Sequence, residues 1–180
     1  MRIASCVIVA CLPAAASLIA SQPNPVATAL RADMDRYEKI LVASAETMPA
    51  DKYGTKPTDK QMSFGELIRH VTTSNTMLCA WIAGQTAPAM SPWPATPGKD
   101  TLVAALKESF AYCRSALVGV DDSKLGDDVP FFGGRKVTRA AAMFSLSADW
   151  GDHYSLMATE LRLAGQLPPT AQRPANGDGK

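Results

Sequence analysis

The sequence has few of the residues that give a protein an obvious chemistry. Its 180 residues include two histidines, four cysteines and 7% aromatic residues, and 18 lysines and arginines nearly balance 17 acids. With a formal net charge of +1 and no dense basic block, the chain lacks the charge that binding to nucleic acid requires. It also lacks a phosphate-binding glycine loop, a CxxC pair and a Ser-His-Asp nucleophile set. The balanced charge leads us to expect no nucleic acid partner, and the missing motifs make those three classes of site less favoured.

The first 20 residues are typical of a secretory signal. One basic residue, Arg2, precedes an apolar run that ends near Ala20 in small residues suited to signal peptidase. The alternative is a membrane helix, but Pro13 interrupts the run, and a span needs about 20 unbroken apolar residues. A lipoprotein anchor at Cys11 is a lesser alternative, because Cys11 lies within the apolar run and not just after it. We predict a signal peptide at 1–20, no membrane attachment after its removal, and a periplasmic or secreted protein.

Two cysteines, Cys79 and Cys113, remain in the mature chain after Cys6 and Cys11 leave with the signal. An even number of cysteines in an oxidising compartment favours a disulfide. This bridge would close a loop of about 35 residues and stabilise the fold by about 3–4 kcal/mol. Two buried free thiols are the alternative.

Four segments have the three- and four-residue apolar spacing of helices. They run from Val26 to about Thr47, from Ser63 to Gly84, from about Asp100 to Val118 and from Thr138 to Leu163. The second has the most complete start, because Ser63 and Glu66 form a capping box. Residues 85–99 hold four prolines and a glycine, which predicts a long crossover that lets the second and third helices run parallel. Cys79 and Cys113 would then lie at the same end.

A short β-hairpin is predicted before the last helix. In LGDDVPFFGGRKVTR, two short apolar patches flank Gly133 and Gly134, a typical turn pair. The chain after Pro169 lacks large apolar side chains, so 171–180 is expected to be a flexible tail. The sequence thus predicts an all-α fold over 21–170: a four-helix bundle with a long crossover between helices two and three and a small β-hairpin before helix four.

The last helix carries ionisable residues on its predicted buried stripe. At about 100° per residue, His153 lies about 40° and Glu160 about 20° from Asp149, near Leu146 and Leu163. Burying such groups without partners costs several kcal/mol, so a metal ion, a reciprocal hydrogen bond or an open cleft should satisfy them. The D-x-x-x-H step from Asp149 to His153 suits a single cation, and equally an ordinary Asp–His hydrogen bond.

The other histidine, His70, belongs to the second predicted helix. It lies about 120° from the centre of that helix's apolar stripe, on a flank shared with Met77 and Trp81. It therefore faces either a second groove or solvent. An enzyme built here would have a cleft lined by Trp81, Met77 or the proline-rich crossover, with an ion at its base.

Two stretches of the chain resemble the DinB/YfiT-like family of four-helix bundles. MPADKYGTKPTDKQMSFGELIRHVTTSN is similar to the first half of that family, where a helix opening with S-[FL]-x-E-L carries a metal-ligating histidine at the position of His70. ADWGDHYSLMATELRLAGQLPP resembles the family's last helix. The likeness covers residues 26–170, and the crossover and the hairpin fit it as well.

The resemblance implies a metal site with one departure from the family pattern. The family's last helix typically carries H-x-x-x-H, but Asp149 takes the first place here, so the ligand set becomes His70, Asp149 and His153. Two histidines and a carboxylate bind divalent nickel, zinc, manganese or iron and leave positions for water or substrate. A decayed site is the alternative.

The resemblance also implies a choice of functions. Family members include thiol-dependent transferases and isomerases, so we expect a metal-dependent thiol transferase or hydrolase acting on a small-molecule substrate of unknown identity. Small thiols are chiefly cytosolic, which fits poorly with export. The alternative is a non-catalytic bundle with a degenerate metal site, associated with stress or binding a partner. Catalytic residues are unknown beyond Glu160, a candidate base, and the resemblance implies a possible homodimer.

Overall fold

The computed structural model of the chain describes residues 24–90, 92–94 and 96–172. Within these residues there are four α-helices: α1 (Pro25–Thr47), α2 (Phe64–Ile82), α3 (Lys99–Leu117) and α4 (Arg139–Leu163). Strands β1 (Asp128–Pro130) and β2 (Lys136–Thr138) form an antiparallel pair before α4. None of the helices described is long and apolar enough to cross a membrane. The predicted signal peptide at 1–20 lies outside the described residues.

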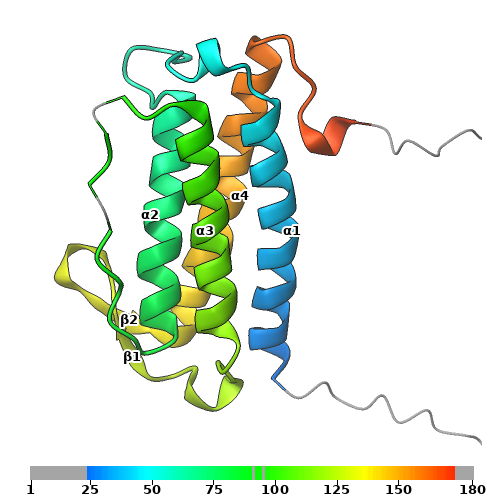
Figure 1. Cartoon of the computed structure of the whole chain (residues 1–180). Helices are drawn as coiled ribbons and strands as arrows, with labels where there is room; N and C mark the ends of the chain where they lie inside the picture. The colour runs from blue at the N-terminus through cyan, green and yellow to red at the C-terminus, as the bar shows by residue number, and fades with distance from the viewer. Residues whose placement is uncertain (1–23, 91, 95, 173–180) are drawn as a thin grey trace, which may run out of the picture.

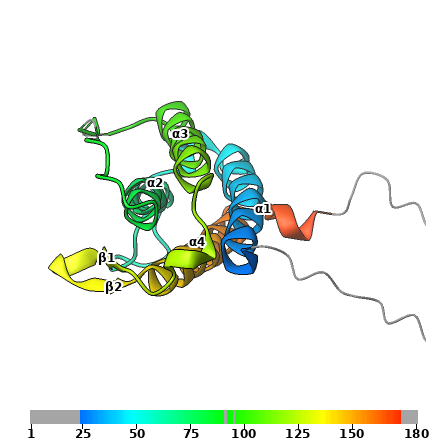
Figure 2. The same cartoon turned by 90° about the horizontal axis from the view of Figure 1, so that it is seen from below.

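Helices α2 and α3 run parallel, and α1 and α4 run in the opposite direction (Figure 1). Viewed along the bundle, α2 packs between α3 and α4, and α1 packs between the same two helices on the far side (Figure 2). The crossover from α2 to α3 returns along the outside of α2 (Figure 1). The predicted all-α fold is therefore confirmed, including the parallel pair, the long crossover and the hairpin.

The core consists of the apolar stripes that the helical spacing predicts. Removing these side chains from water is the main force that holds the four helices together. The predicted stripes of α2 and α3 are fully buried: Phe64, Leu67, Ile68, Val71, Leu78, Ile82, Leu102, Leu106, Phe110, Cys113 and Leu117. The start of α2 is also as predicted, since the Glu66 amide donates to Ser63 Oγ and the Ser63 amide donates to Glu66 Oε2.

A disulfide and a hydrogen-bond network join α2 to its neighbours in the bundle. Cys79 and Cys113, near the C-terminal ends of α2 and α3, form a disulfide with their Cα atoms 5.2 Å apart. One turn earlier, the buried Asn75 accepts a 2.6 Å hydrogen bond from Trp150 Nε1 and donates a 3.0 Å bond to Ser109 Oγ. We call Asn75, Trp150 and Ser109 the Asn75 network. Because it joins α2, α3 and α4, it fixes how those helices are rotated against one another.

Charged side chains from other elements satisfy the ends of the helices. The Asp122 carboxylate accepts from two amides in the first turn of α1, and Lys99 donates to two carbonyls at its other end. Arg31 donates to carbonyls at the end of α3, and Arg139 to the last carbonyl of α2. Each charge opposes the partial charge of the helix end that it contacts, so these pairs stabilise the termini.

The hairpin and the C-terminal segment add short structure at the two ends of the bundle. Gly133 and Gly134 have φ values of 68° and 70°, which glycine adopts without strain, and Val129 pairs with Val137 across the strands. After α4, a 3₁₀ turn at Pro169–Ala171 is held by Tyr154, whose hydroxyl lies 2.6 Å from Thr170 Oγ1. The chain after residue 172 lies outside the described residues.

Candidate metal centre

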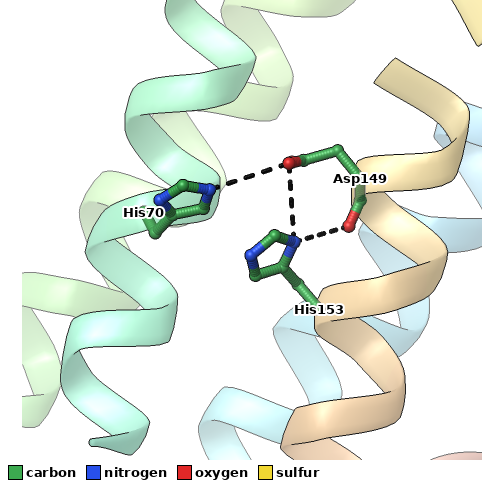
Figure 3. Close-up of side chains that lie close together, drawn as sticks. All are labelled: His70, Asp149 and His153. Carbon is green, nitrogen blue, oxygen red and sulfur yellow. Dashed lines mark hydrogen bonds and ion pairs between the residues drawn. The ribbon is translucent and has the colours of Figure 1, made fainter. Parts of the chain in front are cut away.

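The three predicted ligands lie together at the interface between α2 and α4 (Figure 3). His70 comes from α2, and Asp149 and His153 come from successive turns of α4. One nitrogen or oxygen atom from each residue lies within 4.8 Å of the others. We call these three residues the triad. The structure therefore brings together side chains from two helices that are far apart in the sequence.

The Asp149 carboxylate lies between the two imidazoles. Its Oδ1 atom is 3.7 Å from His70 Nε2 and 3.5 Å from His153 Nδ1. Dashed lines mark both contacts in Figure 3. The two rings stack at 4.5 Å between centroids with 23° between their planes. Ser74 Oγ is 3.4 Å from His70 Nε2, a contact that the sequence analysis missed although Ser74 lies one turn after His70. The triad is thus assembled by loose polar contacts.

A backbone hydrogen bond orients the His153 ring. Its Nδ1 atom lies 2.7 Å from the carbonyl oxygen of Asp149. A carbonyl only accepts, so Nδ1 is the donor, and in the neutral imidazole Nε2 then has the lone pair. Metal-binding histidines commonly donate their second ring nitrogen to such an oxygen, which orients the ring and raises its basicity. His153 is therefore prepared to bind a cation through Nε2.

The triad lies at the rim of the buried face of α4, which differs from the predicted stripe. The side chains of His70, Asp149 and His153 are 45%, 18% and 8% exposed. Leu163, which the helical spacing placed on the buried stripe, is exposed, whereas Trp150 and Met157 are fully buried. The buried face is centred on these larger side chains, and this rotation moves Asp149 outward. A ligand can reach the triad as a result.

The Asp149 carboxylate is short of partners. Burial raises its pKa, and the neighbouring histidines oppose that rise. Its Oδ2 atom is buried and has no hydrogen-bond partner among the described residues. A buried carboxylate oxygen without a donor is costly, and a cation would satisfy it. Two imidazoles and this carboxylate are a donor set that fits a divalent transition metal.

The triad atoms must move slightly closer together to share one metal ion. Atoms that share a tetrahedral metal at bond lengths of about 2.0–2.2 Å lie about 3.4 Å apart, and the triad atoms lie within 4.8 Å. His70 is the most exposed of the three and is held by long contacts to Ser74 and Asp149. It is therefore the ligand that can move to close the site.

Glu160 lies apart from the triad, although the helical spacing grouped it with Asp149 and His153. It borders a separate cavity of about 160 Å³, beside Lys52, Thr55 and Lys56. The residue is 5% exposed, and its Oε2 atom has no hydrogen-bond partner among the described residues. Burial raises the pKa of Glu160 to about 7. The structure thus does not support the use of Glu160 as a base at the triad.

The crossover also lies away from the triad. It lines a cavity of about 510 Å³ with Thr72 and Thr76 of α2 and with residues of α3, and no triad residue borders that cavity. Trp81 packs instead against Phe132 of the hairpin, 5.2 Å between ring centroids. The predicted cleft under the crossover therefore exists, but it has no triad residue at its base.

The model of one known protein family covers α2 and most of α4, the two helices that carry the triad. The model of the DinB superfamily matches residues 33–157, which include all three triad residues. The chain belongs to the DinB superfamily. This match confirms the resemblance seen in the two sequence stretches. No curated protein matches the chain.

Solved structures of DinB-like proteins share the bundle. A DinB-like protein from Bacillus subtilis is 22% identical with a TM-score of 0.64, covering 81% of this chain and 99% of that one. One from Bacillus cereus is 13% identical with a TM-score of 0.63, covering 79% and 95%. A mutant of a mycothiol-dependent maleylpyruvate isomerase is 18% identical with a TM-score of 0.56, covering 72% and 58%. At these identities the DinB likeness shows the fold alone.

Proposed function

We propose that the protein is an exported DinB-superfamily protein that binds one divalent metal ion through His70, Asp149 and His153. The convergence of these three groups at the α2–α4 interface carries the proposal. The unpartnered Oδ2 of Asp149 and the hydrogen bond from His153 Nδ1 to a backbone carbonyl support it. When bound, a nickel, zinc, manganese or iron ion would lower the pKa of a coordinated thiol or water and so supply a nucleophile at neutral pH.

The residues around the ion would have distinct tasks. His153 is buried and oriented by the Asp149 carbonyl, so it forms the fixed part of the site. Asp149 supplies a negative charge that favours a cation, and its unpartnered Oδ2 atom would gain a partner. The exposed side of His70 leaves room for a small substrate to approach from solvent. We propose a thiol-dependent transfer or a hydrolysis as the reaction class, partly because one structural neighbour is a mycothiol-dependent isomerase.

Export is the part of this proposal that rests on the sequence and on the disulfide. The N-terminal 20 residues have the pattern of a signal peptide, and the Cys79–Cys113 bond suits an oxidising compartment. In such a compartment a water nucleophile is more available than a small cytosolic thiol. The homodimer, the absence of a nucleic acid partner and the absence of membrane attachment stay predictions.

A metal analysis tests the site directly. The full chain, purified from its native compartment, should contain about one metal ion per chain, the occupancy of a mononuclear site. The His70→Ala, His153→Ala double variant and Asp149→Asn should contain only traces. Glu160→Gln is the matched control, because it alters another buried carboxyl of α4 that lies outside the triad, and it should keep its metal. Equal metal content in all four proteins would contradict the proposed site.

A second candidate is a non-catalytic metal-binding module. It is favoured by the replacement of a family histidine by Asp149 and by the absence of triad residues from the crossover cavity. Loading the protein with Co²⁺ and titrating a small thiol separates the two candidates. A new thiolate-to-cobalt absorption band would show an open position and support the enzyme, whereas an unchanged spectrum would support the module.

A further inference from the structure

Ser74 is the hydroxyl residue that lies one turn after His70 on α2. Its neighbours Thr72, Thr73 and Thr76 each donate a hydrogen bond to the backbone carbonyl four residues earlier. This is a common bond for a serine or threonine inside a helix. Ser74 Oγ instead lies 3.4 Å from His70 Nε2. The Ser74 hydroxyl is therefore turned toward the triad rather than toward the helix backbone.

The step from His70 to Ser74 repeats the step from Asp149 to His153. Residues four apart in a helix lie one turn apart on the same face. Asp149 and His153 project from α4 toward His70 (Figure 3), so each helix brings one such pair to the α2–α4 interface. An open metal site has three protein ligands and a fourth position for water or substrate. Ser74 is the member of the two pairs that the triad does not use.

The distance between Ser74 Oγ and His70 Nε2 suits a group beside a bound ion. Atoms that share a tetrahedral ion lie about 3.4 Å apart, and these two atoms are 3.4 Å apart. A neutral hydroxyl is not among the common protein ligands of zinc, which are thiolate, imidazole and carboxylate. Ser74 is therefore better suited to contact the group at the ion's fourth position than to bind the ion itself.

Metal binding takes away the partner of the Ser74 hydroxyl. To bind an ion, His70 Nε2 must hold a lone pair, and in that form Ser74 Oγ–H is the donor of their contact. The ion then uses the same lone pair, so the hydroxyl proton needs another acceptor. Ser74 is only 3% exposed, which leaves little access for bulk water. An acceptor bound to the ion beside His70 would restore the hydrogen bond.

We propose that Ser74 is a positioning residue of the metal centre, whose hydroxyl donates a hydrogen bond to the ligand at the ion's fourth position. This inference rests on the proposed metal site and deepens it, because it names the group that orients what the ion binds. A hydrogen bond to a charged acceptor is stronger than one to a neutral acceptor. Ser74 therefore favours a small anionic ligand, such as hydroxide or a thiolate, over a neutral one.

Cobalt spectroscopy of Ser74→Cys tests the placement of the hydroxyl. The variant puts a thiol where the hydroxyl lies, and a thiolate within reach of the ion binds it directly. With equimolar Co²⁺ and no added thiol, we expect a thiolate-to-cobalt absorption band. Thr72→Cys is the matched control, because Thr72 is also buried but lines the crossover cavity, which no triad residue borders. It should give the wild-type spectrum.

The outcomes separate this inference from the metal site on which it rests. A Ser74→Cys protein that binds Co²⁺ without the band would overturn the placement of Ser74, and so would the same band in Thr72→Cys. If the wild type itself binds no Co²⁺, the proposed metal site is wrong, and the role of Ser74 is wrong with it.

Azide titration of the Co²⁺-loaded protein tests the hydrogen bond. Azide is a small anion with lone pairs that can occupy the fourth position. Ser74→Ala should bind Co²⁺ as the wild type does, but it should bind azide about tenfold more weakly, the effect of one hydrogen bond to a charged group. Ser155→Ala is the control, because this exposed serine of α4 donates to the Gly151 carbonyl, and it should bind azide as the wild type does.

Two results of the azide titration would overturn the proposal. Equal azide affinity in Ser74→Ala and the wild type would show that the hydroxyl turns to its own helix when the ion binds, as the Thr72 hydroxyl does. A wild type that binds Co²⁺ but not azide would show that no ligand can sit beside Ser74.

Discussion

Neighbouring residues on α2 and α4 belong to two very different polar groups. Asn75 and Trp150 point into the core, where the Asn75 network satisfies its members with bonds of 2.6 and 3.0 Å. Asp149, next to Trp150, points outward to the triad, where the contacts to the imidazoles are 3.5 and 3.7 Å and one carboxylate oxygen has no partner. The same two helices thus carry one closed network and one incomplete one.

This difference separates stability from ligand binding. The Asn75 network and the disulfide hold α2 at a fixed rotation and height without any metal, so the triad residues are brought together before a ligand arrives. The triad adds little to that framework, because its contacts are long and His70 is half exposed. Substitutions in the Asn75 network or the disulfide should therefore lower the free energy of unfolding, whereas substitutions in the triad should leave stability nearly unchanged but abolish metal binding.

The largest expected effect is loss of the disulfide. The Cys79→Ala, Cys113→Ala double variant should lose about 3–4 kcal/mol of unfolding free energy, because the unfolded chain regains the freedom of a loop of about 35 residues. Urea unfolding measures this, and the reduced wild type should match the variant. Alkylation without reductant, followed by mass spectrometry, provides the check: two modified thiols would disprove the bond.

Next in size is the substitution Asn75→Leu. It leaves the buried Trp150 N–H without its acceptor and the Ser109 hydroxyl without its donor, and it should cost about 2–3 kcal/mol of unfolding free energy. The matched control is Ser74→Ala, which changes the neighbouring residue that contacts His70 and should cost less than about 1 kcal/mol. Equal losses in the two variants would remove the contrast between the core network and the triad.

Local patterns were enough to predict the helices and their order. The capping box at Ser63 is a contact between residues three apart, and the core stripes of α2 and α3 follow from helical spacing alone. The composition of the crossover predicted the parallel pair. These features depend on short stretches of sequence, and the chain's membership of the DinB superfamily agrees with them.

Features that depend on helix rotation were not predicted. The Asn75–Trp150 bond joins residues 75 positions apart, and the Asp122 cap on α1 joins residues 96 positions apart. The position of Asp149 at the rim was missed because the predicted stripe gave no weight to Trp150 and Met157, whose burial turns α4. Helical spacing alone paired Asp149 with His153, and only the family resemblance added His70 to form the triad.

A smaller, pH-dependent effect belongs to Glu160, the other unsatisfied carboxyl of α4. Burial raises its pKa from 4.5 to about 7, so the folded state holds the proton more tightly than the unfolded state does. The protonated Glu160 side chain contributes its full stabilisation below pH 4.5, and this is lost as the pH rises to about 7. The free energy of unfolding should fall by about 2 kcal/mol over that range. Glu160→Gln should not show this loss of stability. Urea unfolding of both proteins at about pH 5 and about pH 8 measures the difference. The same pH dependence in both proteins would mean that another group is responsible.

The smallest expected effect on folding, and the sharpest test of the comparison, is His70→Ala in metal-free protein. Its side chain is 45% exposed and makes only long contacts, so the change in unfolding free energy should be less than about 0.5 kcal/mol. With Zn²⁺ at about 100 times its dissociation constant, the wild type should gain about 2.7 kcal/mol and the variant should gain nothing. The measurement is urea unfolding with and without the ion. Because the Asn75 network is intact in both proteins, a variant that unfolds without metal would show that the triad itself supports the fold, and a variant stabilised as much as the wild type would show that Zn²⁺ binds elsewhere.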